Sequence, residues 1–329
     1  MYCDVDSILK NIRFICIMKL YKKKGDRMIK ITLIGTGGMV PLPSRYLASC
    51  HIEFKGKAIL IDCGEGTQIS LHKGKISLIK IDTILITHCH ADHVTGLPGL
   101  LLTMGNHGRT EPLNIVAPRG STKILNSLMV VCGFLPFEIR IAELHDTKSQ
   151  EFNKIGFNIR SIPLKHHINC LGYSFELNLR PHFQPDKAKK YNIPVKLWKI
   201  LHGGEEVVVD DRTITPDMVL GSPRKPIKIS YVTDTRPVKL IDEIVKDSDL
   251  FICEGMYGND EMLDGAVAKM HMIFSEAANI ALNAGVKELW LTHFSPSMPN
   301  PEEYRIFAAK IFDNTVIGKD LMSKTLRSI

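Results

Sequence analysis

Apolar residues along this chain gather in short runs that alternate with amphipathic segments. The runs are typical of buried strands, and they predict strands over residues 29–38, 49–54, 57–64, 82–88, 112–118, 154–164, 171–177, 228–235, 249–255 and 288–294. Segments with helix-like periodicity predict helices over residues 98–106, 121–132, 238–246, 274–284 and 301–312. Strand-rich stretches with interspersed helices indicate an α/β fold in which two mixed sheets pack face to face under outer helices, an αββα sandwich.

Composition places the chain among ordinary globular proteins. It has 329 residues, 44% of them hydrophobic and 23% charged, which is enough to bury a full core. No apolar run reaches the roughly 18 residues that a bilayer span needs, and no export signal opens the chain. The eight cysteines are scattered without a CxxC pair, so they indicate reduced thiols. We therefore predict a cytoplasmic protein without membrane association.

The positive charge is concentrated at the start of the chain. The formal net charge is +7, and residues 1–30 hold eight Lys/Arg against three Asp, which leaves only +2 for the remainder. Met28 directly precedes the first predicted strand. We interpret residues 1–28 as an N-terminal extension that is dispensable for folding, and residues 29–329 as one domain.

The stretch after the strand at 82–88 is rich in metal-binding side chains. His88, His90, Asp92 and His93 fall within six positions as H-x-H-x-D-H. On an extended backbone His88 and His90 project to the same side, where both rings can hold one metal, while Asp92 and His93 follow in a loop and can reach a second. Imidazole and carboxylate together favour zinc, and they also suit manganese or iron.

Further donors follow other apolar runs. His166 and His167 precede a Gly-Tyr pair, and Asp234 and His293 each come after a predicted strand. A single Asp or His at a strand end usually caps or terminates the element. Their repeated occurrence at strand ends predicts that they complete a metal centre.

Several catalytic motifs of other enzyme classes are absent. The sequence contains no G-x-S-x-G elbow, no G-x-x-x-x-G-K-[ST] loop and no G-x-G-x-x-G after its first strand. The segment "GTGG" after that strand instead indicates a tight turn close to the predicted site.

Four features carry a family resemblance: the H-x-H-x-D-H cluster, the His before Gly-Tyr, the "TDT" and the final "THFS". In these features the chain resembles the metallo-β-lactamase fold, and within it the ribonuclease Z branch of tRNA 3′-processing endonucleases. The stretches "GTGGMVPLPSRYLAS" and "HADHVTGLPGLL" and the segment from 186 to 237 favour that branch. The resemblance runs from about residue 29 to the C-terminal helix.

The resemblance implies two Zn²⁺ ions per chain, with Mn²⁺ or Fe²⁺ as alternatives. It assigns His88, His90 and His166 to one metal, Asp92, His93 and His293 to the other, and Asp234 to both. His166 is preferred to His167 because the family's ligand lies six residues before the Gly of the Gly-Tyr pair. A Glu–His pair near the metals falls on Glu254 and His271.

Two metals imply a mechanism for phosphodiester hydrolysis. Paired cations lower the pKa of a bound water and neutralise charge on the phosphoryl oxygens, so a dizinc-bound hydroxide would be the nucleophile. Asp92 would orient the water and accept its proton, and His271, held by Glu254, would stabilise the transition state or protonate the departing oxygen. The family implies removal of the 3′ trailer of precursor tRNA, leaving a 3′-hydroxyl on the tRNA.

A basic segment is the predicted RNA-binding element. Six cations against Asp186 give residues 180–202 a charge of +5, and the cations are Arg180, Lys187, Lys189, Lys190, Lys196 and Lys199. Phe183, Tyr191 and Trp198 are interleaved with them, and they can stack on bases or form a small core. The resemblance implies an inserted arm over about residues 178–212 that clamps the tRNA elbow; a solvated helix face is the alternative.

Three departures from the family pattern stand out: the first concerns the fold and grip of the arm, and the other two concern specificity, including the rejection of mature CCA-bearing tRNA. The chain has "IPVKLW" where the arm of the family carries Gly-Pro, "CEGM" in place of a "HEAT"-like loop, and "HMI" in place of "HST". Three functions therefore stand: a dizinc tRNA 3′-endonuclease, a general phosphodiesterase of the same fold acting on small substrates, and a non-catalytic RNA-binding relative. The resemblance also implies a homodimer.

Overall fold

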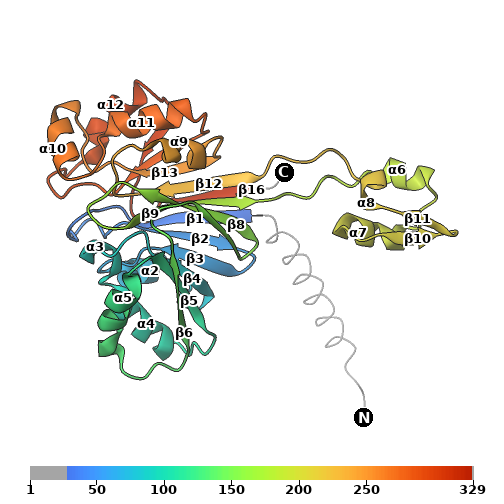
Figure 1. Ribbon diagram of the computed structural model, residues 1–329, viewed down its shortest axis with the longest axis horizontal. Helices are drawn as coiled ribbons and strands as arrows, with labels where there is room; N and C mark the ends of the chain where they lie inside the picture. The colour runs from blue at the N-terminus through green and yellow to red at the C-terminus, as the bar shows by residue number, and fades with distance from the viewer. Residues whose placement is uncertain (1–27, 328–329) are drawn as a thin grey trace, which may run out of the picture. The chain divides into compact units, whose positions relative to one another are not determined.

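The computed structural model describes residues 28–327, and within them two seven-stranded sheets pack against each other (Figure 1). The first sheet has the order β16-β1-β2-β3-β4-β5-β6. Its strands are β1 (Met28–Gly35), β2 (Ser49–Phe54), β3 (Lys57–Ile61), β4 (Ile81–Leu85), β5 (Leu113–Pro118), β6 (Ile139–Leu144) and β16 (Ser323–Arg327). Strands β3 to β6 are parallel, whereas β16, β1, β2 and β3 pair in antiparallel fashion.

The second sheet has the order β15-β14-β13-β12-β9-β8-β7. Its strands are β7 (Gln150–Lys154), β8 (Phe157–Leu164), β9 (Cys170–Leu177), β12 (Ile227–Val232), β13 (Leu250–Glu254), β14 (Leu289–Thr292) and β15 (Thr315–Ile317). Strands β12 to β15 are parallel. The two sheets meet through their inner faces, where the rings of Phe54 and Phe157 lie 5.4 Å apart.

Helices cover the outer face of each sheet (Figure 1). The first sheet carries α2 (Thr67–Lys73), α3 (Ala91–Val94), α4 (Leu97–Asn106), α5 (Ser121–Met129) and the 3-10 turns Leu78–Lys80 and Val130–Cys132. The second carries α9 (Lys239–Val245), α10 (Leu263–Ala268), α11 (Phe274–Asn283), α12 (Arg305–Ala309) and the turns Asp260–Met262 and Pro301–Tyr304. Each helix layer has its own apolar cluster with its sheet, so the predicted αββα sandwich is confirmed.

The predicted elements differ from the observed ones chiefly at their ends. The strand predicted over 82–88 ends at Leu85, and the helix predicted over 301–312 is a 3-10 turn followed by α12. The helix predicted over 121–132 leaves α-helical geometry after Met129, where two β-branched valines precede Gly133 in a positive-φ conformation. Strands β6, β7, β15 and β16 were missed because they are short and carry polar residues, so only pairing with a neighbour defines them.

Residues Glu176–Ile227 form a second compact unit, which includes the range 178–212 predicted for the arm. Its elements are α6 (Pro185–Lys190), α7 (Val195–Gly203), the hairpin β10 (Val207–Val209) and β11 (Arg212–Ile214), and α8 (Pro216–Val219). A small core of its own holds the unit together, formed by Ala188, Ile193, Leu201, Val207, Ile214 and Val219 with Phe183 and Trp198 packed on it.

The predicted N-terminal extension lies, apart from Met28, outside the described residues. Met28 itself opens β1 and pairs with Arg327 of β16. Within residues 28–327, none of the helices has the length and apolar character required to cross a bilayer.

Candidate metal centre

Loops at the carboxyl ends of strands from both sheets bring the predicted donors together. His88 and His90 lie in the loop after β4, His166 lies between β8 and β9, Asp234 follows β12, and His293 follows β14. Asp92 and His93, predicted in a loop, lie on the short helix α3. Strand ends from two sheets therefore converge on one centre, as the repeated strand-end donors predict.

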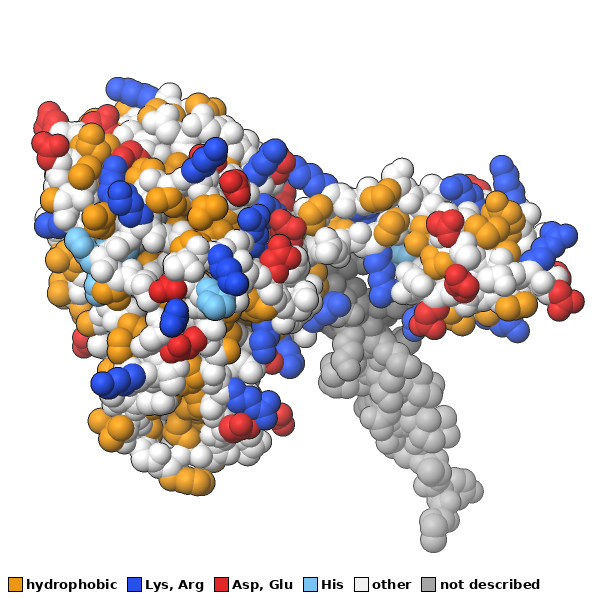
Figure 2. Space-filling model, in the orientation of Figure 1, with side chains coloured by type: hydrophobic (Ala, Val, Ile, Leu, Met, Phe, Trp, Pro, Cys, Tyr) orange, Lys and Arg blue, Asp and Glu red, His pale blue; other side chains and the backbone are white. Residues whose placement is uncertain are grey.

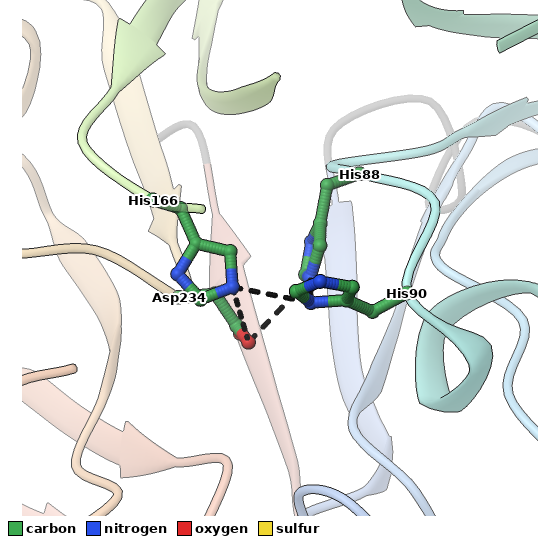
Figure 3. Close-up of side chains that lie close together, drawn as sticks. All are labelled: His88, His90, His166 and Asp234. Atoms are coloured by element: carbon green, nitrogen blue, oxygen red, sulfur yellow. Dashed lines mark hydrogen bonds and ion pairs between the residues drawn. The ribbon is translucent and has the colours of Figure 1, made fainter. Parts of the chain in front are cut away.

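Three histidines form the first donor group (Figure 3). The Nδ1 atom of His90 lies 3.0 Å from Nε2 of His88 and 3.1 Å from Nε2 of His166. His167 is exposed and, within residues 28–327, belongs to none of the donor groups, whereas His166 belongs to the first. Ligands of a tetrahedral zinc ion, each roughly 2.0–2.1 Å from it, lie about 3.3 Å from one another. The separations in this group therefore fit a single metal ion.

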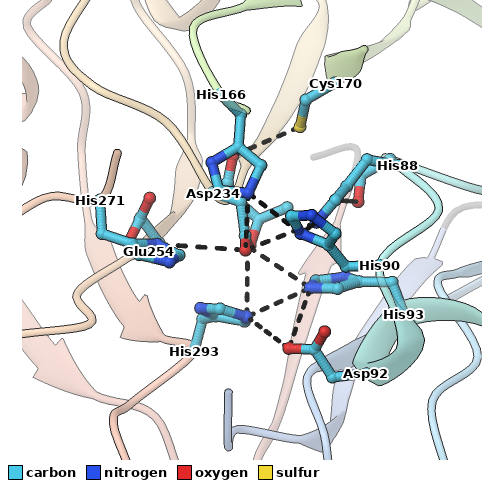
Figure 4. Close-up of polar contacts among 12 residues, drawn as sticks. His88, His90, Asp92, His93, His166, Cys170, Asp234, Glu254, His271 and His293 are labelled. Atoms are coloured by element: carbon cyan, nitrogen blue, oxygen red, sulfur yellow. Dashed lines mark hydrogen bonds and ion pairs between the residues drawn. The ribbon is translucent and has the colours of Figure 1, made fainter. Parts of the chain in front are cut away.

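Asp92, His93 and His293 form the second group (Figure 4). The Nε2 atoms of His93 and His293 are 3.2 Å apart, and each lies 3.5 Å from Oδ2 of Asp92. The main-chain N–H of Met39 donates to the same Oδ2 at 2.7 Å, which brings the "GTGG" turn to the site as predicted. A Cβ atom on Gly38 would lie 2.7 Å from the His293 ring, so this turn requires glycine for its close approach.

Asp234 lies between the two groups and directs one oxygen to each. Its Oδ2 is 3.5 Å from His88 Nε2 and 3.8 Å from His166 Nε2, whereas its Oδ1 is 3.2 Å from His293 Nε2 and 3.5 Å from His93 Nε2. Asp234 and His293 both adopt positive φ angles, 38° and 60°, which are sparsely populated for these residues and typical of functional sites. This is the arrangement expected of a carboxylate that bridges two cations.

Burial and charge set the protonation of the donors. Burial lowers the pKa of His166 to about 4 and, with the neighbouring His93, lowers that of His88 well below its usual value. Both rings are therefore neutral near pH 7, which is the form that binds metals. Burial would raise the pKa of Asp234, but His293 and His93 hold it well below its usual value. His88 and His166 thus offer neutral imidazoles beside the ionised Asp234. Burial would lower the pKa of His93, but Asp234 and Asp62 raise it well above its usual value.

Asp62 is a site residue that the sequence reasoning missed. It follows β3, is fully buried, and its Oδ2 accepts hydrogen bonds from His93 Nδ1 at 2.8 Å and Thr87 Oγ1 at 2.7 Å. The Thr87 hydroxyl in turn lies 3.1 Å from His88 Nδ1. Each contact leaves the Nε2 atom of its histidine for a metal. The available signal was its place at the end of an apolar run, as for Asp234.

Glu254 and His271 form the predicted pair beside the donors (Figure 4). Glu254 is the last residue of β13, and its Oε2 accepts from His271 Nδ1 at 3.0 Å while its Oε1 accepts from the Thr235 main-chain N–H at 2.5 Å. Burial alone would lower the pKa of His271, but the Glu254 carboxylate beside it raises that pKa to about 9. Glu254 therefore orients His271 and holds the loop that carries Asp234.

Comparison with known proteins shows the family of this chain. The family model described as "Anti-Pycsar protein Apyc1" matches residues 29–211. A Ribonuclease Z of Clostridium kluyveri is 49% identical over 300 residues, covering 91% of this chain and 99% of that protein. A Ribonuclease Z of Clostridioides difficile is 48% identical over 301 residues, covering 91% and 99%.

The chain belongs to the ribonuclease Z family.

Solved structures place the fold of this ribonuclease Z family member. Human tRNase Z, short form, has a TM-score of 0.66 at 23% identity and covers 91% of this chain and 100% of that one. The metallo-β-lactamase fold protein YhfI of Bacillus subtilis also has a TM-score of 0.66, at 18% identity, covering 91% and 100%. These structures show that the chain has the metallo-β-lactamase fold. Its membership of the ribonuclease Z family makes it a hydrolase.

The predicted RNA-binding residues of this family member lie in the second unit, apart from the donors in sequence. Lys187, Lys189 and Lys190 are on α6, Lys196 and Lys199 are on α7, and all five are exposed. Arg180 donates to the carbonyl oxygen of His202 at 3.3 Å. Residues 203–227 hold five Asp/Glu against three Lys/Arg, and side chains of both signs show on this unit in Figure 2. The basic character therefore belongs to the two-helix half.

Proposed function

We propose that the protein is a zinc-dependent endoribonuclease that hydrolyses a phosphodiester at the 3′ end of precursor tRNA and removes the 3′ trailer. The observation that carries the proposal is the double donor cluster, in which Asp234 turns one oxygen to each of two histidine groups. The residues of the first group are His88, His90 and His166, and those of the second are Asp92, His93 and His293. Family membership supplies the substrate class.

Two Zn²⁺ ions suit this donor set, and Mn²⁺ or Fe²⁺ suit the same imidazole and carboxylate ligands. Such a pair, when bound, supplies a water of lowered pKa and neutralises charge on the phosphoryl oxygens. The fit rests on donor separations near those of a tetrahedral ion and on Asp62, which fixes a ring of each group.

Asp92 and His271 perform the proton transfers of the proposed reaction. Asp92 has its Oδ2 fixed by the Met39 main-chain N–H, so it orients the attacking water and accepts a proton from it. The water oxygen bonds to phosphorus as the bond from phosphorus to the ribose 3′ oxygen breaks. His271 has Nδ1 engaged by Glu254, and its Nε2 proton passes to the leaving 3′ oxygen. The products are a 3′-hydroxyl and a 5′-phosphate.

The second unit supplies affinity for RNA in this proposal. The exposed lysines of α6 and α7 contact backbone phosphates, which contributes affinity without sequence preference. Of the three aromatic residues in the basic segment, Phe183 and Trp198 pack in the core of the unit, and Tyr191 is 46% exposed. Tyr191 is therefore the aromatic side chain that can stack on a base.

We also propose that the protein is a homodimer in the cytoplasm. Its exposed apolar side chains support the dimer: Val130, Val131 and Phe134 are 77%, 73% and 91% exposed within five residues after α5. Neighbouring apolar side chains left in water favour association with another protein surface. The partner of this surface in the proposal is a second copy of the chain.

Incubation of the purified chain with a precursor tRNA and, in parallel, with a chromogenic phosphodiester tests the activity. We expect both to be hydrolysed by protein that holds close to two zinc ions per chain, neither after chelation, and both again after zinc is restored. His90→Ala removes a donor of the first group and should abolish hydrolysis while the circular dichroism spectrum is kept. Full activity of metal-free protein would contradict the proposal.

The same assay separates the two other functions. The donor cluster itself does not select the groups esterified to the phosphate, so hydrolysis of the chromogenic substrate without tRNA cleavage would identify a phosphodiesterase acting on small substrates. RNA binding with neither activity would identify a non-catalytic relative.

A further inference from the structure

A guanidinium group links the loop of Asp234 to the segment that carries His271. Arg236 donates through Nη1 to the carbonyl oxygen of His271 and to Glu276 Oε2, the latter at 2.9 Å, and through Nη2 to Glu276 Oε1. The Arg236 side chain is 14% exposed and that of Glu276 is 20% exposed. The pair is thus largely withdrawn from water, where a forked guanidinium–carboxylate contact is strong and geometrically specific.

Glu276 anchors this pair to a helix. It occupies the first turn of α11, and its Oε2 also accepts the Ile273 main-chain N–H at 3.1 Å. The same carboxylate therefore caps α11 and fixes Arg236. The Glu276 side chain therefore holds both the Ile273 main chain, two residues after His271, and the Arg236 guanidinium.

The main chain of Arg236 reaches a third loop. Its N–H donates to the Lys165 carbonyl oxygen at 3.0 Å, next to His166, and His166 Nδ1 lies 3.2 Å from the Met270 carbonyl oxygen. Arg236 thus connects the loop of Asp234, the loop of His166 and the segment of His271. Glu254 provides the other connection, between Thr235 and the His271 ring.

We propose that Arg236, fixed by Glu276, is a positioning residue that sets where the His271 ring lies relative to the donors and to the leaving 3′ oxygen. The proposal rests on the proposed function, in which His271 Nε2 delivers the proton to that oxygen as its bond to phosphorus breaks. Glu254 fixes the Nδ1 end of the ring, and the His271 main-chain N–H donates to the Ala266 carbonyl oxygen at 2.9 Å. Arg236 holds the other main-chain polar group of His271, its carbonyl oxygen, so the residue is fixed on both sides.

Leaving groups of different basicity distinguish this role from a general structural one. A nitrophenolate leaves without protonation, whereas a ribose or alkyl oxygen requires it. In Arg236→Gln we expect kcat on precursor tRNA to fall by about 10- to 100-fold, part of the 10²–10⁴ that a general acid typically contributes. KM should stay within about two-fold. Turnover of a nitrophenyl phosphodiester and zinc content should be nearly unchanged. Arg236→Lys keeps the charge but not the forked pair of donors, so its kcat on precursor tRNA should lie between those of the wild type and Arg236→Gln.

A double variant tests whether Arg236 acts through His271. Arg236→Gln combined with His271→Ala should be no slower on precursor tRNA than His271→Ala alone, within about two-fold, because the ring to be positioned is gone. Arg305→Gln is the matched control, since Arg305 also donates to a main-chain carbonyl oxygen, that of Thr315 at 2.8 Å. It should leave both substrates unaffected.

Three results would overturn the proposal. Equal losses of kcat on both substrates, together with lost zinc, would show that Arg236 stabilises the metal centre. A raised KM for precursor tRNA with unchanged kcat would show that Arg236 contacts RNA. Additive losses of kcat in the double variant would show that Arg236 acts independently of His271. If the wild-type chain leaves precursor tRNA intact, the tRNA function fails. Arg236 is then tested on a nitrophenyl and an unactivated alkyl phosphodiester.

Discussion

At the scale of single residues, buried side chains outside the donor groups orient the donors. Asp62 holds His93 directly and His88 through Thr87, so one buried carboxylate orients a histidine of each donor group. Such contacts fix the ring orientation and raise the basicity of a metal ligand.

Asp62→Asn should weaken zinc binding by about 10- to 100-fold, because the amide nitrogen that replaces one oxygen cannot accept a hydrogen bond. Competition with a chromogenic zinc chelator measures the affinity. The control is Asp82→Asn, which changes a carboxylate on β4 that pairs with Lys57 at 2.8 Å. This variant should leave zinc affinity unchanged. Equal affinities in all three proteins would refute the role of Asp62.

His51 should make the stability of the protein depend on pH. It is 2% exposed, and its Nε2 has no hydrogen-bond partner among the described residues 28–327. Burial lowers its pKa to about 4, with Glu53 opposing and Lys30 and Lys80 adding to the shift. The unfolded chain, with a pKa of about 6.5, takes up the proton first. The stability from neutral His51 is therefore complete above pH 6.5 and is lost as the pH falls toward 4.

Urea unfolding at pH 7.5 and pH 5 measures this effect. His51→Gln should lose less free energy of unfolding than the wild type over that range, by roughly 2 kcal/mol, because one pKa unit corresponds to about 1.4 kcal/mol. His145→Gln alters an exposed ring and should behave as the wild type. Parallel pH dependence in all three would exclude His51 as the source.

At the scale of elements, the second unit is a small structure with a core of its own. Residues 180–202 contain part of that core, including Ala188, Ile193 and Leu201, and the rest comes from β10, β11 and α8. Removing the basic segment alone would expose the remaining apolar side chains. A variant that tests the unit should therefore lack most of the residues between Leu177, at the end of β9, and Ile227, at the start of β12.

Replacing residues 179–225 by a Gly/Ser linker should leave zinc content and small-phosphodiester turnover nearly intact, because none of the donors lies there. Precursor-tRNA cleavage should fall steeply through KM, since binding made equally in the ground and transition states changes KM rather than kcat. A second variant that changes Lys187, Lys190, Lys196 and Lys199 to Gln keeps the core. It should reduce the log–log salt slope of tRNA binding by roughly 0.7–0.9 for each phosphate that a lysine no longer neutralises. Equal losses on both substrates would show a structural role, and unchanged tRNA cleavage would favour a small-substrate phosphodiesterase.

At the scale of the whole molecule, the exposed apolar segment after α5 provides a test of the proposed homodimer. Phe134→Lys with Val131→Lys should shift the mass measured by light scattering from dimer toward monomer, because two charges cannot be buried in an apolar contact without partners. Ile306→Lys, at a residue of α12 that is 51% exposed, is the matched control and should remain dimeric. A wild-type monomer at micromolar concentration would refute the proposal.

The sequence by itself determined the main strands, the fold class and the identity of the candidate donors. Buried strands are recognisable as apolar runs, and H-x-H-x-D-H places four donors close together through local geometry alone. The tertiary structure decided what depends on distances between segments far apart in the chain. Only it turns the two oxygens of Asp234 to different histidine groups, brings Asp62 to His93, and places Arg236 on the His271 carbonyl. Strands β15 and β16 likewise exist through their partners, because three or five partly polar residues have no strong preference of their own.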